Sequence, residues 1–278
     1  MKYGIAELVG AMGAGPVFVH SDPFRAARAV KPVRDRNAYL DSHISVLREA
    51  ASDRGLWLPT FNYDFPRTGV FDIAQSESQL GPIPERFRAH AAEWRTPVPI
   101  FSIAGIGPGS QPRWGFLTDP FGEDSMFARV VQSDGVVLYY GETFHYNTLV
   151  HYAERAAGGP LYRYDKIFPG RVIMTDGTSV EGSLDYHVRP AGTGLDYDWP
   201  RLLNEALAAG VCRRLDGAPE ILAASAAQLT DLWVNEMKRD PFALLDAKTR
   251  EWAEPRVNEL GRRFELRDFE KAEGQRKP

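Results

Sequence analysis

Short apolar runs alternate with longer amphipathic stretches along the chain, which is typical of a mixed α/β protein. Four of the runs predict strands, and the last two, which are β-branched and aromatic, predict buried ones. They cover residues 17–20, 56–61, 98–104 and 136–140. The last two are each followed by a glycine, which favours an end to the strand at that point.

The stretches between these runs predict helices. Residues 37–52 place Leu40, Ile44 and Leu47 on one face, and Gly55 follows as a stop signal. Because an apolar stripe of this kind covers one face of a sheet, we expect this helix to pack against the predicted strands.

Later helices are indicated by their start signals. A second helix is expected to begin at Pro84, a third after Asp124 and a fourth after Asn147. The tail, residues 199–270, is expected to be mostly helical, with the Asp-Pro pair at 240–241 as a cap and first turn.

The order of elements predicts an α/β fold with a mixed central β-sheet flanked by helices and a helical C-terminal portion, about residues 199–270. With no internal repeat or linker in the sequence, we expect residues 1–278 to form a single domain. The Gly- and Pro-rich residues 105–120 predict a long loop, either a binding loop or a plain surface excursion.

Composition narrows the class of protein. The 278 residues are 44% hydrophobic and 25% charged, which excludes collagen-like and disordered chains. A net charge of −4 argues against a nucleic-acid binder. No long apolar run or signal pattern is present, so we expect no membrane association and a cytoplasmic location. The lone Cys212 excludes an intrachain disulfide and a multi-cysteine zinc site.

Residues 141–155, GETFHYNTLVHYAER, carry the most informative pattern. Thr148, His151 and Glu154 recur every third residue of the fourth helix and are expected on one stripe, directly after a buried strand. One interpretation is that His151 is a general base tuned by a carboxylate. The other is a partly buried histidine satisfied by its neighbours, and the spacing alone favours it.

Three further segments place small or polar residues beside the ends of predicted elements. The first would be a polar wall for a substrate or a solvated loop, the second a close approach for a ligand, and the third an anion site or a simple helix cap. The residues are Asp64, Arg67 and Asp72 in 60–72, Ala104, Gly105 and Gly107 in 94–109, and Glu123, Asp124 and Ser125 in 119–131.

Several common motifs are missing from the sequence. It contains no G-x-S-x-G, Walker or H-E-x-x-H pattern, and GIGPG lacks the later glycine of a dinucleotide fingerprint. Cys212 fits a small packing residue better than a nucleophile. His145 and His151 do not have the spacing of a metal site, so no metal is expected.

Six segments, taken in order, resemble the aminoglycoside 3-N-acetyltransferase family and its antibiotic N-acetyltransferase fold, over roughly residues 17–154. They are VFVHSDPFR, LPTFNYDFPRTGVFD, SESQLGPIPERFR, RTPVPIFSIAGIG, PFGEDSMFARVV and GETFHYNTLVHYAE. The resemblance implies an N-acyltransferase that uses acetyl-CoA or another acyl-CoA as co-substrate, with direct attack of an amine on the thioester.

The resemblance also implies roles for individual residues. His151 would act on the acceptor amine, with Glu154 and Thr148 as its catalytic neighbours. The residues expected at the CoA arm and the cleft are Ser21, Ser102, Ala104, Gly105, Gly107 and Ser125. The expected substrate-binding residues are Asp64, Arg67, Asp72, Glu123 and His145.

The chemistry of amide formation agrees with a basic histidine. An amine with a pKa near ~10 is mostly an ammonium ion at neutral pH and must lose a proton to attack. A histidine whose pKa lies near ~6.5, raised by a neighbouring carboxylate, is suited to accept that proton.

Departures from the family pattern bear on the acceptor. Antibiotic-modifying members usually carry histidines at the positions of Val98 and Phe101, and an aspartate where this chain has His145. Residues 162–172, YRYDKIFPGRV, look like members linked to sugar and surface-polysaccharide biosynthesis. We therefore expect an amino-sugar acceptor, with a nucleotide-linked sugar as one form. An aminoglycoside acceptor, a non-catalytic binding relative and a homo-oligomer stay open.

Overall fold

The computed structural model describes residues 2–109 and 113–270. Its main sheet has the strand order β4-β5-β2-β1-β6-β10-β9. The bounds are β1 Val17–Ser21, β2 Leu56–Pro59, β4 Trp94–Arg95, β5 Ile103–Ile106, β6 Val136–Tyr140, β9 Cys212–Leu215 and β10 Ala218–Ser225. Strands β2, β1 and β6 are parallel and the others run antiparallel to their neighbours, which confirms the predicted mixed sheet.

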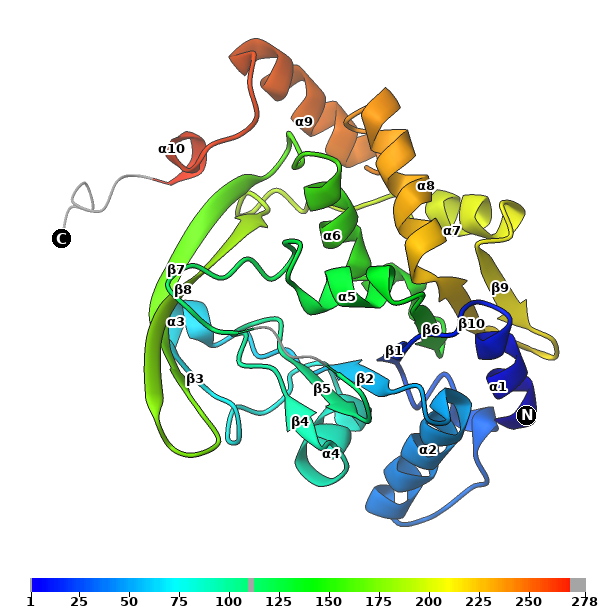
Figure 1. Cartoon of the computed structure of the whole chain (residues 1–278). Helices are drawn as coiled ribbons and strands as arrows, with labels where there is room; N and C mark the ends of the chain where they lie inside the picture. The colour runs from blue at the N-terminus through cyan, green and yellow to red at the C-terminus, as the bar shows by residue number, and fades with distance from the viewer. Residues whose placement is uncertain (1, 110–112, 271–278) are drawn as a thin grey trace.

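Helices cover both faces of this sheet (Figure 1). One face carries α1 Lys2–Gly10, α2 Arg36–Ala51 and α4 Pro82–His90, and the other carries α5 Met126–Gln132, α6 Leu149–Ala156, α7 Trp199–Ala208 and α8 Ala226–Arg239. Successive strand residues point to opposite faces, so Val17 and Val19 join the core under α2 while Phe18 joins the core under α5 and α6. The flanking helices predicted from the sequence are confirmed.

A long hairpin lies beside the main sheet (Figure 1). Strand β7 Tyr164–Ile173 pairs with β8 Ser179–Val188 along its full length, and β3 Val70–Asp72 pairs with the far end of β7. The remaining helical elements are the long α9 Ala247–Leu260, the short α3 Phe65–Thr68 and α10 Leu266–Phe269, and 3-10 turns at Ala27–Ala29 and Phe144–Tyr146. Because β7 begins shortly after α6 ends, the hairpin is brought close to that helix.

Some predicted bounds need correction. The strand at 136–140 is confirmed, and the helix at 37–52 is found one residue earlier. The strand expected at 98–104 is present only as β5, because Pro97 and Pro99 lack N–H donors and Ile100 adopts φ 64°. The helix expected from Pro84 begins at Pro82, after Gly81 at φ 115°.

The tail is less helical than predicted. A β-hairpin of β9 and β10 turns at Gly217, whose φ of 75° suits glycine, and extends the main sheet. The Asp-Pro pair at 240–241 forms a turn, with Asp240 Oδ1 accepting from Phe242 N at 3.0 Å. The helix α9 starts only after Asp246, which caps it by accepting from Thr249 N at 2.6 Å.

Two further expectations concern the loop and the membrane. Of the loop expected at 105–120, residues 110–112 lie outside the described residues, and Ile106 belongs to β5. Thr118 attaches the later part of the loop to β8, since its N–H donates to Ser183 O at 2.8 Å.

Within residues 2–109 and 113–270, no helix has the length and apolar character needed to cross a bilayer.

Candidate active site

The start of α6 places His151 and Glu154 on one face of the helix. After β6, Gly141 turns the chain at φ 105°, and Asn147 Oδ1 accepts from Leu149 N at 3.2 Å to begin the helix. The i, i+3 spacing then brings His151 Nδ1 to 2.9 Å from Glu154 Oε2. The predicted contact between these two residues is present.

Glu154 is fully buried and lies at the centre of a group of donors from four segments of the chain. Its Oε2 also accepts a hydrogen bond from Nε2 of His187, a residue of β8, at 2.9 Å. Its Oε1 accepts from the hydroxyls of Tyr162 at 2.9 Å and Tyr197 at 2.6 Å. Arg163 Nε lies 3.4 Å from Oε1, so a guanidinium balances the buried carboxylate.

These contacts fix the protons on both histidines. An ionised carboxylate only accepts hydrogen bonds, so His151 Nδ1 and His187 Nε2 must both carry hydrogen. In the neutral form His151 Nε2 is then a free base. Within the described residues, the contacts of the His151 ring to polar partners, Glu154 and Tyr197, are both at Nδ1.

Burial controls the charge of the site. Burial first, and the Arg163 cation second, lower the pKa of His151 to about 4, although Glu154 opposes both. Burial alone would raise the pKa of Glu154, but Arg163 and the hydrogen bonds from the two histidines outweigh it and hold this pKa well below its ordinary value. The pKa of His151 is thus lowered, where the sequence predicted that the carboxylate would raise it, because desolvation and Arg163 dominate.

The same cluster has the composition of a metal site. The donor atoms of His151, Glu154 and His187 lie within 4.8 Å of one another. However, the 2.9 Å contacts are hydrogen-bond distances, and the Arg163 cation faces the carboxylate that would have to hold a second cation. The arrangement therefore fits a proton-handling cluster better than a metal ligand set.

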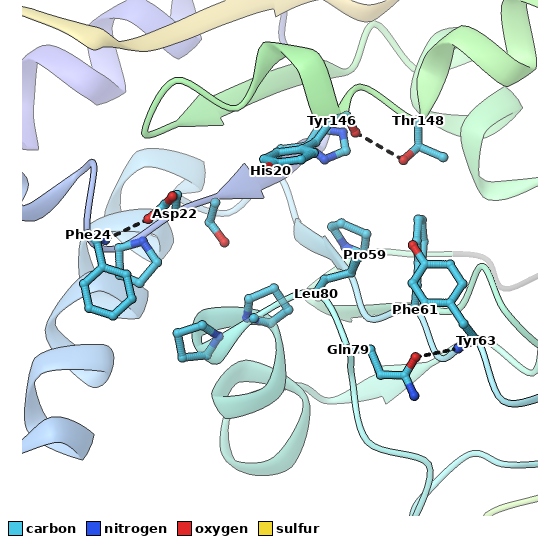
Figure 2. A pocket seen from close by; sticks show the side chains of 15 residues that line it. His20, Asp22, Phe24, Pro59, Phe61, Tyr63, Gln79, Leu80, Tyr146 and Thr148 are labelled. Atoms are coloured by element: carbon cyan, nitrogen blue, oxygen red, sulfur yellow. Dashed lines mark hydrogen bonds between the residues drawn. The ribbon is translucent and has the colours of Figure 1, made fainter. Parts of the chain in front are cut away.

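Members of this cluster line one cavity, and a second cavity shares a lining residue with it. The His151 cavity has a volume of about 440 Å³ and the His20 cavity about 490 Å³, and Tyr63 lines both. The lining of the His151 cavity includes Phe101, His145, Arg163, His187, Arg189 and Asp196. Figure 2 shows the His20 cavity, with His20 near the end of β1, Pro59 at the end of β2, Phe61 just after it, and Tyr146 and Thr148 before α6.

The His20 cavity carries buried polar atoms with no partner of their own. His20 Nε2 and Ser21 Oγ have no hydrogen-bond partner among the described residues. Burial lowers the pKa of His20 to about 3, so its ring is neutral at physiological pH. Because unsatisfied buried polar atoms are costly, these two atoms are suited to a bound ligand.

Thr148 does not join the His151 pair. It precedes the first residue of α6, its Oγ1 reaches the carbonyl of Tyr146 at 3.4 Å, and it lines the His20 cavity. Of the three residues expected on one face of the helix, His151 and Glu154 therefore lie together and Thr148 does not, since it precedes the regular helix.

Of the residues expected at the CoA arm, Ser21 alone lines either cavity. Ser102 is buried and bonded to Thr60 and Arg95, and Ser125 caps α5 by accepting from Ala128 N. Ala104, Gly105 and Gly107 lie elsewhere because β5 runs antiparallel to β2, which places its later residues at the opposite end of the sheet. A Cβ on Gly105 would lie 2.1 Å from the Trp94 ring, so this glycine serves packing.

Of the expected substrate-binding residues, His145 alone lines the His151 cavity. Asp64 pairs with Arg67 at 3.1 Å on the exposed side of α3. Asp72 Oδ1 accepts from Ala74 N at 2.8 Å and closes a turn, while Glu123 is exposed outside both cavities. The solvated-loop alternative describes the placement of Asp64, Arg67 and Asp72.

The sequence did not point to four residues that contact Glu154. They are Tyr162, Arg163, His187 and Tyr197. Tyr162 and Arg163 lie in the YRYDKIF segment, which the sequence marked only by its resemblance to certain family members. That resemblance did not predict that these two side chains contact Glu154. His187 and Tyr197 are 33 and 43 residues from Glu154, and no local pattern signals contacts at that range.

Comparison with known proteins gives a consistent family. The sequence model of the family described as Aminoglycoside 3-N-acetyltransferase matches residues 47–238. Aminoglycoside N(3)-acetyltransferase VII of Streptomyces paromomycinus is 27% identical over 187 residues, 54% of this chain and 63% of that protein. Aminoglycoside N(3)-acetyltransferase VIII of Streptomyces fradiae is 31% identical over 97 residues, 33% of each chain. The matches span less than two thirds of these relatives.

Solved structures share the fold over most of the chain. AAC-IIIb in a binary complex with CoASH superposes with a TM-score of 0.66 at 22% identity, covering 86% of this chain and 96% of that one. Aminoglycoside acetyltransferase AAC(3)-Xa gives 0.66 at 21%, covering 87% and 93%. YokD of Bacillus subtilis gives 0.65 at 16%, covering 86% and 93%.

Proposed function

Since the chain belongs to the aminoglycoside 3-N-acetyltransferase family, we propose that it is an acyl-CoA-dependent N-acyltransferase that moves an acetyl or other short acyl group to the amine of an amino sugar. The observation that carries the proposal is the His151–Glu154 pair. Glu154 binds Nδ1–H, which leaves Nε2 as the basic atom of a ring that lines a cavity.

In this proposal His151 is the general base. With its pKa lowered to about 4, the ring is neutral at physiological pH and can accept a proton from the attacking amine. The amine nitrogen forms the amide bond, the thioester C–S bond breaks, and the proton taken by Nε2 passes to the leaving thiolate. Glu154 keeps its negative charge and stabilises the imidazolium while it carries the proton.

We assign the acyl-CoA to the His20 cavity and the acceptor to the His151 cavity. The two cavities share Tyr63, and Thr148 lies in the first only three residues before His151 in the second. His20 Nε2 and Ser21 Oγ, which have no hydrogen-bond partner in the part of the chain that the structure describes, are suited to the amide and carbonyl groups of a pantetheine arm. The CoASH complex of AAC-IIIb, which has the same fold, supports this co-substrate.

The charges of the His151 cavity support an acceptor with few positive charges. Asp196 is the one carboxylate among the described residues that line it, and its Oδ1 already accepts from Tyr197 N and Trp199 Nε1. Arg189 lines the same cavity and is exposed. A cavity lining with one carboxylate and an exposed arginine offers little attraction to a polycation. An amino sugar, nucleotide-linked forms included, does not need an acidic lining.

An aminoglycoside acceptor is the second candidate, because the family model and the two Streptomyces relatives carry that name. A non-catalytic binding relative is the third candidate, and the complete His151–Glu154 pair argues against it.

The residues that line the two cavities come from β1 through to the start of α7. Because both cavities draw on this whole span, we propose that the chain acts as a single domain.

A thiol-release assay tests the proposal. Acetyl-CoA is offered with amino sugars, nucleotide-linked amino sugars and aminoglycosides in turn. We expect CoA release with the sugar amines at a kcat/KM well above that with aminoglycosides. The reverse order would replace the first candidate by the second. Saturable binding of acetyl-CoA without release from any acceptor would support the third.

A further inference from the structure

We propose that His187 is a positioning residue for the reaction, which holds Glu154 in the orientation that keeps His151 Nε2 facing the cavity. This inference rests on the function proposed for His151. His187 comes from β8, and its Nε2 lies 2.9 Å from the same Oε2 atom that receives His151 Nδ1. One carboxylate oxygen is therefore shared by two histidines from separate elements.

The remaining contacts complete the anchoring of the carboxylate. A carboxylate offers about four lone-pair positions, and Tyr162 and Tyr197 occupy the two on Oε1. His187 fills the second position on Oε2. Without His187, His151 would be the one remaining donor to Glu154 Oε2 among the described residues. The carboxylate that orients His151 would then itself be held less firmly.

Burial decides which histidine exchanges protons with a substrate. The side chain of His187 is 0% exposed and that of His151 is 23% exposed. His187 Nδ1 has no partner among the described residues, so a proton there would create an unsolvated cation. Burial lowers the pKa of His187 accordingly, although Glu154 opposes this, and the residue remains a neutral N–H donor.

Loss of this donor has a predictable electrostatic effect. The charged groups that face the two histidines are Glu154, Arg163 and Arg155, and each acts on at least one of them. When His187 no longer binds Oε2, the carboxylate attracts the His151 proton more strongly. The pKa of His151 should then rise, and the acid limb of the rate profile should move to higher pH.

Two variants of the whole chain separate the hydrogen bond from packing. His187→Phe keeps a ring against Phe121, whose centroid lies 5.5 Å from that of His187, but has no donor. His187→Gln restores an N–H donor at a similar reach. His43→Phe is the matched control, since His43 is fully buried but bonds Tyr140 on the other face of the sheet.

We expect His187→Phe to lower kcat by about 10–100-fold, with the acid limb raised and the KM for acetyl-CoA little changed. His187→Gln should recover most of kcat, and His43→Phe should retain the wild-type value. Nitrogen-15 NMR of the imidazole rings, which needs no acceptor, should show the Nδ1–H tautomer of His151 in the wild type, and a raised pKa of the same ring in His187→Phe.

The inference is overturned if His187→Phe keeps both the wild-type pKa of His151 and the wild-type kcat, or if His43→Phe loses kcat equally. Should His187→Phe not fold, a folded His187→Gln protein with a raised His151 pKa and a reduced kcat would overturn it, and one with the wild-type pKa and most of kcat would support it. The NMR result stands even if no acceptor releases CoA. Failure of the proposed function is therefore distinguishable from failure of the role assigned to His187.

Discussion

Replacement of Glu154 by glutamine removes the charge at the centre of the site while preserving the shape of the side chain. Glu154 accepts four hydrogen bonds of 2.6–2.9 Å and is fully buried. A glutamine has one oxygen and one NH₂ group. If its NH₂ faces the two histidine N–H groups, donors oppose each other; if it faces the two tyrosine hydroxyls, both hydroxyls must turn from donating to accepting.

The magnitude follows from the buried cation that is left behind. Breaking a buried ion pair by removing one partner costs about 3–5 kcal/mol, and Glu154 is the carboxylate paired with Arg163 among the described residues, so Arg163 would keep a buried charge without it. For domains near this size that loss corresponds to a melting temperature lower by roughly 6–20 °C. Loss of the partner that holds a catalytic histidine in its tautomer lowers kcat by about 10⁴-fold in a serine protease, and we expect a loss of similar order.

Thermal unfolding and CoA release measure the two effects on one preparation. The matched control is Glu220→Gln, a buried carboxylate that pairs with Arg28 at 2.7 Å outside both cavities. We expect this control to keep the wild-type kcat. If Glu154→Gln melted at the wild-type temperature and turned over at the wild-type rate, the carboxylate would not organise the site and the reasoning would be refuted.

Three further predictions rest on other buried groups. Burial lowers the pKa of His20 to about 3 and those of His43 and His151 to about 4, so the unfolded chain binds more protons between about pH 4 and 6.5. The free energy of unfolding should then fall as pH is lowered through that window, by up to about 1.4 kcal/mol per pH unit for each ring, and equal urea midpoints at pH 7 and 5 would contradict this. Burial raises the pKa of the Cys212 thiol to about 12, so Cys212→Ser should leave kcat unchanged, and loss of turnover in a folded protein would instead indicate an acyl-cysteine route. Ser21→Ala should raise the KM for acetyl-CoA about 2–10-fold at constant kcat, and an unchanged KM would remove Ser21 from the donor site.

Local signals in the sequence were sufficient for the central layer of the fold. VVLYY is apolar at every position, and its strand is fully buried with neighbours on both sides. The His151–Glu154 contact was predictable for a similar reason, because i, i+3 residues of a helix are neighbours whatever surrounds them. Where structure is set within one element, the sequence sufficed.

The rest depended on how distant elements meet. Gly105 and Gly107 look like an approach for a ligand only if β5 is parallel to β2, and the antiparallel pairing moves them to the other end of the sheet. The β7–β8 hairpin brings His187 to Glu154 across 33 residues. In the tail, APEILAAS is a short apolar run that helix and strand patterns share, and pairing with β6 makes it a strand.

The central claim is that His151 takes the proton from the acceptor amine. Its most direct test is kcat for His151→Ala at saturating acetyl-CoA, measured at neutral pH and again above the pKa of the amine. The account predicts a loss of about 10²–10⁴-fold at neutral pH, a smaller loss at high pH, and unchanged acetyl-CoA binding by calorimetry. A variant that turns over at the wild-type rate at neutral pH would contradict it.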